Sequence, residues 1–143
     1  MPELEAIKDQ IVAVNGGKLA DFVSLVKHLP DMIQEDETVE KVLEGSLKDD
    51  LVLVVATDRR LVLLASTIHG KDLRLASLAY GSIRFVQGYV EKTFWSGTKG
   101  YLRILDAELK ETVIGGIYKY DSEDFARHVQ NKIDRLKTSV DLP

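Results

Sequence analysis

Few residues in this chain have a type and spacing that suit catalysis. The acidic run QEDE at residues 34–37 could imitate a pair of catalytic carboxylates, but such a run before a strand is usually a solvated connection. The sequence contains no G-x-S-x-G, no H-E-x-x-H and no phosphate-binding glycine loop. Gly115-Gly116 fits a bend or a close backbone approach in a strand better than a phosphate site. We therefore expect a protein that is not an enzyme and has no catalytic residues.

Metal and thiol chemistry are equally disfavoured. The chain has no cysteine, which excludes disulfides, thiol catalysis and the usual ligands of structural zinc. The three histidines, His28, His69 and His128, are far apart in the sequence and lack ligand spacing. We expect no metal site and no cofactor.

The best candidate for a binding surface is the segment KTFWSGTKGY at residues 92–101. Phe94 and Trp95 lie close to a Ser-Gly turn, with Lys92 and Lys99 on either side. A loop of this kind can anchor a partner or touch an interface. The alternative is that Trp95 folds back to close the end of a barrel.

A second candidate lies in LVLVVATDRRLVLLA, residues 51–65, where three charged residues interrupt an apolar run. The charges fall between two apolar halves of similar length, which predicts the tip of a tight antiparallel hairpin with Asp58-Arg59 in the turn. Arg59 and Arg60 could bind an anionic partner, although a solvated hairpin tip is the simpler interpretation.

Composition limits the class of partner. The 143 residues are 45% hydrophobic and 29% charged, with a net charge of −4, which is typical of a globular protein and gives no general attraction to nucleic acid or an anionic bilayer. The N-terminus lacks a basic region followed by a long apolar stretch, and no apolar run is long enough to span a membrane. We expect a cytoplasmic protein that does not bind nucleic acid.

Three segments have helical spacing. Apolar residues recur at this spacing in residues 4–14, before Asn15-Gly16-Gly17, and again from Leu19 and Phe22 to Leu29, before Pro30. The last segment places Phe125, Val129, Ile133 and Leu136 on one face and is the clearest helix in the chain.

Between these helices the pattern changes to short apolar runs separated by turn signals, which predicts antiparallel strands in a sandwich or small barrel. We predict seven strands, at residues 39–47, 51–57, 60–67, 73–79, 83–93, 100–106 and 111–119.

The hairpin at residues 51–65 is apolar at nearly every position, so both of its faces should be covered. A barrel interior covers one face. The other requires either a second chain or the N-terminal helices, with their apolar residues Leu4, Ile7, Ile11, Phe22, Val23 and Val26.

Four segments resemble the bacterial, YokE-like branch of the pleckstrin-homology-like superfamily. They are LVKHLPDMIQEDETVEKVLEG (residues 25–45), VVATDRRLVLL (54–64), YGSIRFV (80–86) and DFARHVQNKI (124–133). The resemblance implies an α+β fold: a pleckstrin-homology-like, seven-stranded antiparallel barrel or sandwich capped by a C-terminal helix and preceded by two short N-terminal helices. It also implies a binding or assembly scaffold without catalytic residues. Inositol phosphate binders of this superfamily use basic residues between their first two strands, whereas SLKDD at residues 46–50 is acidic.

We divide the chain into a helical extension at residues 1–36, which packs on the barrel or on a partner, a pleckstrin-homology-like domain at 37–137 and a tail at 138–143. The predicted function is a non-enzymatic interaction or self-assembly module in the bacterial cytoplasm, with another protein or a second copy as partner. The alternative is peripheral membrane or anionic-ligand binding through the basic and aromatic loop.

Overall fold

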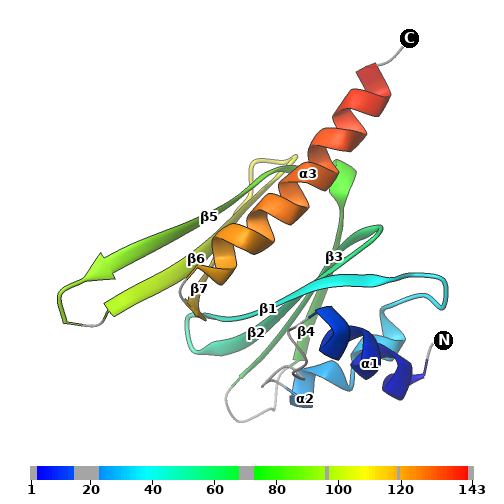
Figure 1. Ribbon diagram of the computed structural model, residues 1–143, viewed down its shortest axis with the longest axis horizontal. Helices are drawn as coiled ribbons and strands as arrows, with labels where there is room; N and C mark the ends of the chain where they lie inside the picture. The colour runs from blue at the N-terminus through cyan, green and yellow to red at the C-terminus, as the bar shows by residue number, and fades with distance from the viewer. Residues whose placement is uncertain (1–2, 15–22, 68–72, 96, 119, 142–143) are drawn as a thin grey trace. The chain divides into compact units, whose positions relative to one another are not determined.

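The computed structural model describes residues 3–14, 23–67, 73–95, 97–118 and 120–141. Its elements, shown in Figure 1, are α1 (Leu4–Val14), α2 (Val23–Val26), η1 (Leu29–Asp31), β1 (Val39–Leu47), β2 (Asp50–Thr57), β3 (Arg60–Thr67), β4 (Leu73–Ala79), η2 (Tyr80–Ser82), β5 (Ile83–Thr93), β6 (Gly97–Asp106), β7 (Glu111–Tyr118) and α3 (Asp121–Asp141). The predicted order of two N-terminal helices, seven strands and one closing helix is confirmed. The chain forms two compact units, Met1–Ser77 and Leu78–Pro143.

The first unit is an antiparallel meander with strand order β4-β3-β2-β1. β1 pairs with β2 from Leu47 opposite Asp50 to Val39 opposite Thr57, and β2 pairs with β3 up to Ala56 opposite Leu61. This register places Asp58-Arg59 at the tip of the β2–β3 hairpin, as predicted from the charged interruption of the apolar run.

Both faces of the β2–β3 hairpin are buried, which confirms the expectation from its composition. One face packs against the N-terminal elements in a cluster that includes Ile7, Ile11, Leu25, Val26, Leu29, Ile33, Val39, Leu53, Val55, Val62 and Leu64. The alternating residues Val52, Val54, Ala56 and Leu61 are also almost fully buried. The cover on the first of these faces therefore comes from the same chain.

Only part of the predicted second helix lies in the described residues. Leu19 and Phe22 lie outside them, and from Val23 the structure describes the four-residue α2 followed by the 3-10 turn η1. Pro30 lies at the start of η1. Proline suits this position because the first N–H groups of a helical turn have no partner within the turn and the φ of proline is close to the helical value. Val26 and Leu29 are buried, as predicted.

The second unit has the strand order β7-β6-β5, with α3 packed mainly against β5. β6 begins at Gly97 rather than at residue 100, so the β5–β6 hairpin is longer than predicted. Phe125, Val129 and Ile133 of α3 are buried, as expected. Leu136 was predicted on the same buried face, but it is 44% exposed. Leu136 lies beyond the buried residue Ile133, and residues 134–137 are all exposed.

Gly88 in β5 permits the close approach of strand and helix. A Cβ atom at this position would lie 2.3 Å from the Ser122 carbonyl oxygen, which is shorter than any ordinary contact. Ser122 is fully buried, and its hydroxyl donates to the Tyr89 carbonyl at 3.4 Å. Farther along, the Gln130 side chain accepts a hydrogen bond from the Val86 N–H at 2.9 Å. The side chains of α3 thus satisfy backbone groups of β5, the last strand of the order.

Candidate functional site

The β5–β6 hairpin carries the candidate binding loop at its end. The two strands pair from Phe85 opposite Leu105 to Thr93 opposite Gly97. Gly97 has a positive φ of 74°, a conformation that glycine adopts without steric cost. The strands therefore stay paired up to the turn, and Phe94 and Trp95 are the turn residues that follow β5.

We call Lys92, Phe94, Trp95 and Lys99 the aromatic tip. The Phe94 residue is 90% exposed and the Trp95 residue 92% exposed, and both lysines are exposed. The two rings contact each other edge to face, with centroids 5.1 Å apart and an interplanar angle of 85°. The alternative that Trp95 folds back to close the end of the barrel is wrong, because the residue is 92% exposed.

The strands behind the tip are joined by side-chain contacts. Tyr89 and Tyr101 stack across the strands with centroids 5.1 Å apart, and Glu91 lies opposite Lys99 two pairs closer to the tip. Burial raises the pKa of the Tyr101 hydroxyl, and Glu91 raises it further. A Cβ atom at Gly115 would lie 3.2 Å from the Tyr101 ring, so this glycine marks a close approach, as the sequence suggested.

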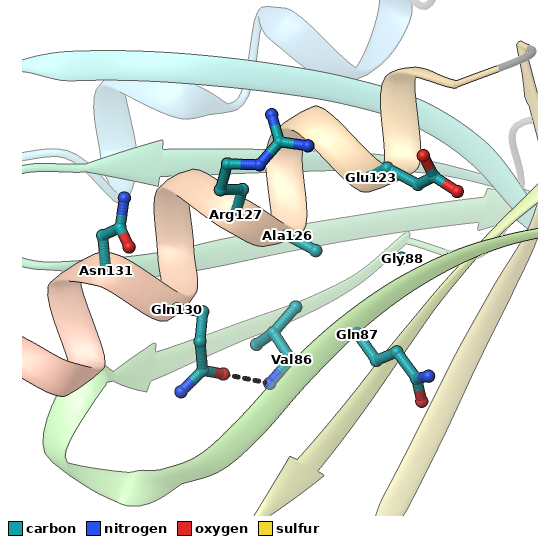
Figure 2. A pocket seen from close by; sticks show the side chains of 8 residues that line it. All are labelled: Val86, Gln87, Gly88, Glu123, Ala126, Arg127, Gln130 and Asn131. Atoms are coloured by element: carbon teal, nitrogen blue, oxygen red, sulfur yellow. Dashed lines mark hydrogen bonds between the residues drawn. The ribbon is translucent and has the colours of Figure 1, made fainter.

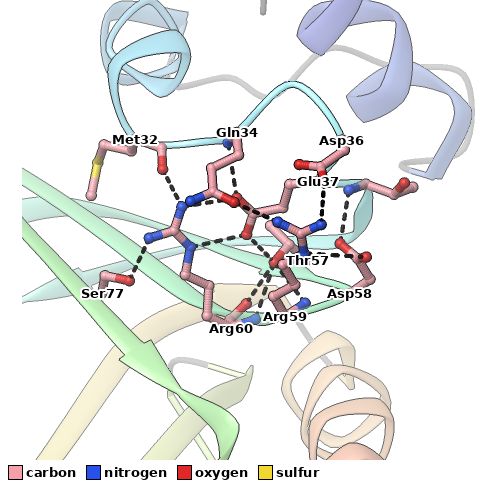
Figure 3. Close-up of polar contacts among 10 residues, drawn as sticks. Met32, Gln34, Asp36, Glu37, Thr57, Asp58, Arg59, Arg60 and Ser77 are labelled. Atoms are coloured by element: carbon pink, nitrogen blue, oxygen red, sulfur yellow. Dashed lines mark hydrogen bonds and ion pairs between the residues drawn. The ribbon is translucent and has the colours of Figure 1, made fainter. Parts of the chain in front are cut away.

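Arg59 and Arg60, the other predicted binding residues, lie in the first unit and have partners within it (Figure 3). Arg59 pairs with Asp36 at 2.6 Å and also donates to the Gln34 side chain. Arg60 binds both carboxylate oxygens of Glu37, at 2.9 and 2.8 Å. It further donates to the Met32 carbonyl and, at 3.1 Å, to the Ser77 hydroxyl.

Glu37 is the buried member of this cluster, with 2% of the residue exposed. Its carboxylate accepts hydrogen bonds from the Thr57 hydroxyl at 2.6 Å and from the Gln34 N–H at 3.0 Å, besides those from Arg60. Burial raises the pKa of Glu37, but the hydrogen bonds from Arg60, Thr57 and Gln34 outweigh it and lower the pKa to about 2. The expectation that residues 34–37 form a solvated connection is therefore wrong for Glu37.

The cluster ties the segment before β1 to the β2–β3 hairpin. Asp58 takes part as well, because its carboxylate accepts from the Thr38 N–H at 2.8 Å. These charges are engaged with one another, an arrangement suited to holding the hairpin rather than to presenting cations to a partner. No signal in the sequence pairs residues that lie twenty or more positions apart, so sequence reasoning missed this role.

Sequence reasoning also missed a groove between β5 and α3 (Figure 2). We call it the α3 groove, with a volume of about 400 Å³, and define it by its lining residues Val86, Gln87, Gly88, Glu123, Ala126, Arg127, Gln130 and Asn131. Figure 2 shows the Glu123 and Arg127 side chains extending from the helix, while the Gln130 amide turns towards β5. The groove depends on the close approach of α3 to β5 at Gly88, and no pattern in the sequence predicts this approach.

Two further properties bear on function. Among the residues that the structure describes, no group of three or more histidine, aspartate or glutamate side chains is placed to hold a metal ion. Within the same part of the chain, no helix combines the length and apolar character needed to cross a membrane.

Comparisons with known proteins give structural neighbours only. No protein-family model matches the chain, and no curated protein sequence matches it. The pleckstrin homology domain from Shewanella amazonensis SB2B is similar in structure, with 22% identity over 66% of this chain and 82% of that chain, at a TM-score of 0.48. A DUF1696 family protein with a pleckstrin-homology domain from Shewanella loihica PV-4 has 19% identity over 81% and 92% of the two chains, at 0.48. The hSac2 domain from human phosphoinositide phosphatase Sac2 has 13% identity over 85% of each chain, at 0.47.

Proposed function

We propose that this chain is a non-enzymatic interaction and self-assembly module of the bacterial cytoplasm that docks through the aromatic tip. The observation that carries the proposal is the exposure of two adjacent large aromatic residues, at 90% for Phe94 and 92% for Trp95. Isolated exposed hydrophobic residues are ordinary, but an adjacent Phe-Trp pair held at the end of a paired hairpin is a preformed anchor.

Energetic arguments favour the tip as an anchor. A phenylalanine and a tryptophan each bury roughly 150–250 Å² when they enter a pocket, and tryptophan is enriched among the residues that dominate binding energy. The edge-to-face contact between the rings and the paired strands behind them restrict the tip before it binds. Less conformational entropy is then lost on docking, which increases affinity.

Other surfaces contribute less to the proposal. The apolar outer face of the β2–β3 hairpin, which the sequence left open to a second chain, is covered by α1 and α2 of the same chain. Arg59 and Arg60 are engaged with Asp36 and Glu37. The aromatic tip is the predicted site whose apolar groups remain exposed.

A second candidate is docking on an anionic membrane surface. It is favoured by Lys92 and Lys99, which flank the two rings in the way that basic residues flank apolar anchors at a bilayer interface. Glu91 lies directly opposite Lys99 and offsets part of this positive charge. We therefore place a protein surface first and the membrane second.

Sedimentation velocity and light scattering over a range of protein concentrations test the proposal. We expect the wild-type mass to rise with concentration, and the double variant Phe94→Ser/Trp95→Ser to keep the mass of one chain. Leu109→Asn is the matched control, because Leu109 is another exposed hydrophobic residue, at 62%, outside the tip. A wild-type mass of one chain at every concentration would overturn self-assembly.

The same proteins are then mixed with vesicles of phosphatidylglycerol and phosphatidylcholine. Absence of binding at low salt is expected. Binding that disappears in Trp95→Ser and weakens as salt is added would show that the partner of the aromatic tip is a membrane and not a protein surface.

A further inference from the structure

We propose, resting on the function proposed above, that the surface which receives the aromatic tip is the α3 groove of a second copy of this chain. The tip and the groove belong to the same compact unit and are different surfaces of it. Each copy therefore offers one projection and one recess.

The groove matches an aromatic side chain in size. Its volume of about 400 Å³ lies within the range of roughly 300–1,000 Å³ found for ligand clefts. Val86 and Ala126 contribute apolar atoms to the lining, Gly88 contributes only backbone, and Gln87 and Gln130 add polar side chains. The amide of Asn131 and the carboxylate of Glu123 at its margin can accept a hydrogen bond from an indole N–H.

Charge complementarity favours this pairing. The first turn of α3 carries Asp121, Glu123 and Asp124, and Glu123 lines the groove. The aromatic tip carries Lys92 and Lys99 beside its rings. A ring inserted in the groove would bring these lysines towards the acidic turn, where opposite charges select the partner and the orientation. Arg127, 3.8 Å from Asp124, can cover the face of an inserted ring.

Such an interface is heterologous, because a projection on one copy meets a recess on the next. Repeated docking builds either a closed ring or an open filament. Two anchoring side chains in a shallow groove form a small interface, below about 1,200 Å², for which weak and concentration-dependent association is expected.

A mixing experiment tests this arrangement. Trp95→Ser removes the projection but keeps the groove, whereas Glu123→Arg reverses the charge at the groove and keeps the projection. We expect each variant alone to lose self-association by more than about tenfold. An equimolar mixture should form a species of two chains and nothing larger, because the intact groove of one variant accepts the intact tip of the other.

Two controls accompany the mixture. Glu108→Arg makes the same charge reversal at an exposed acidic residue in the β6–β7 turn and should assemble like wild type. Thermal unfolding checks that Glu123→Arg is folded. If it is not, Asn131→Arg, an exposed substitution at the same groove, takes its place.

The outcomes separate this inference from the proposed function. If Glu123→Arg and Asn131→Arg assemble like wild type while Trp95→Ser does not, the tip docks elsewhere, so the inference is wrong and the proposed function stands. If both classes of variant fail alone and their mixture stays at the mass of one chain, the complementary pairing is wrong. If wild type does not assemble, both proposals fall.

Discussion

Arg60 and Glu37 form a two-point ion pair in which Nε donates to one carboxylate oxygen at 2.9 Å and Nη2 donates to the other at 2.8 Å. Glu37 is buried and Arg60 is partly exposed. The planar guanidinium matches the carboxylate in this geometry, which a lysine cannot reproduce. The pair joins the segment before β1 to the first residue of β3, and the first two predictions depend on it.

Removal of Arg60 should destabilise the fold strongly. Arg60→Ala leaves the Glu37 carboxylate buried without its main partner, for which we expect a loss of about 3–5 kcal/mol in the free energy of unfolding. Urea denaturation measures it. Arg59→Ala is the matched control, since Arg59 pairs with the exposed Asp36 and should cost less than about 1 kcal/mol. Equal losses in the two variants would contradict the distinction between the two pairs.

Stability should fall in acid because of Glu37. Its pKa is lowered from 4.5 to about 2 by hydrogen bonds to the ionised form. The stabilisation, roughly 3 kcal/mol, is present above pH 4.5 and is lost as the pH falls towards 2. Glu37→Gln should therefore be less stable than wild type at pH 7, and the gap should narrow between pH 4.5 and 2. A gap that is independent of pH would contradict this assignment.

The cover of the β2–β3 hairpin by α1 gives a third prediction. Ile11 is fully buried in the cluster on this face, so Ile11→Asp should lower the free energy of unfolding by at least about 3 kcal/mol. Ala13→Asp on the exposed face of the same helix is the control and should have little effect. Thermal and urea unfolding report both.

Deletion of residues 1–36 should expose the same face and cause aggregation or a change of oligomeric state. Light scattering measures the result. A shortened protein that stays monodisperse at the mass of one chain, with unchanged thermal stability, would show that this cover contributes nothing.

The closing helix gives a fourth prediction. Phe125→Ala should cost about 3–5 kcal/mol, because the side chain is buried between α3 and the strands of its unit. Leu136→Ala should cost less than about 1 kcal/mol, since Leu136 is 44% exposed. Chemical denaturation distinguishes the two, and similar losses would mean that the helix packs through a different face.

The strands and the closing helix could be predicted because their signals are local. Turn residues separate the apolar runs, and the spacing from Phe125 to Ile133 specifies one helix face. The extension of that face to Leu136 was wrong, because periodicity does not say where the packed surface ends.

The candidate site was only partly predictable. The sequence identifies Phe94 and Trp95 beside a turn, but their exposure depends on how far β5 and β6 stay paired. The sequence pattern predicted that β6 begins three residues later than it does. Asp36 and Glu37, which pair with Arg59 and Arg60, belong to the segment before β1, more than twenty positions away, and only the fold brings them together. The α3 groove likewise needs β5 and α3 in contact.

The Glu37 cluster also acts as a check on the register of β1 and β2. Thr57 lies opposite Val39, and Val39 follows Glu37 by two residues. The Thr57 hydroxyl therefore reaches the Glu37 carboxylate only in this alignment. A slip by one residue would turn the alternating side chains of the strand to the opposite faces. It would also bury an acid without its hydrogen-bond donors. Misaligned sheets of this chain are therefore expected to carry an electrostatic penalty in addition to a packing one.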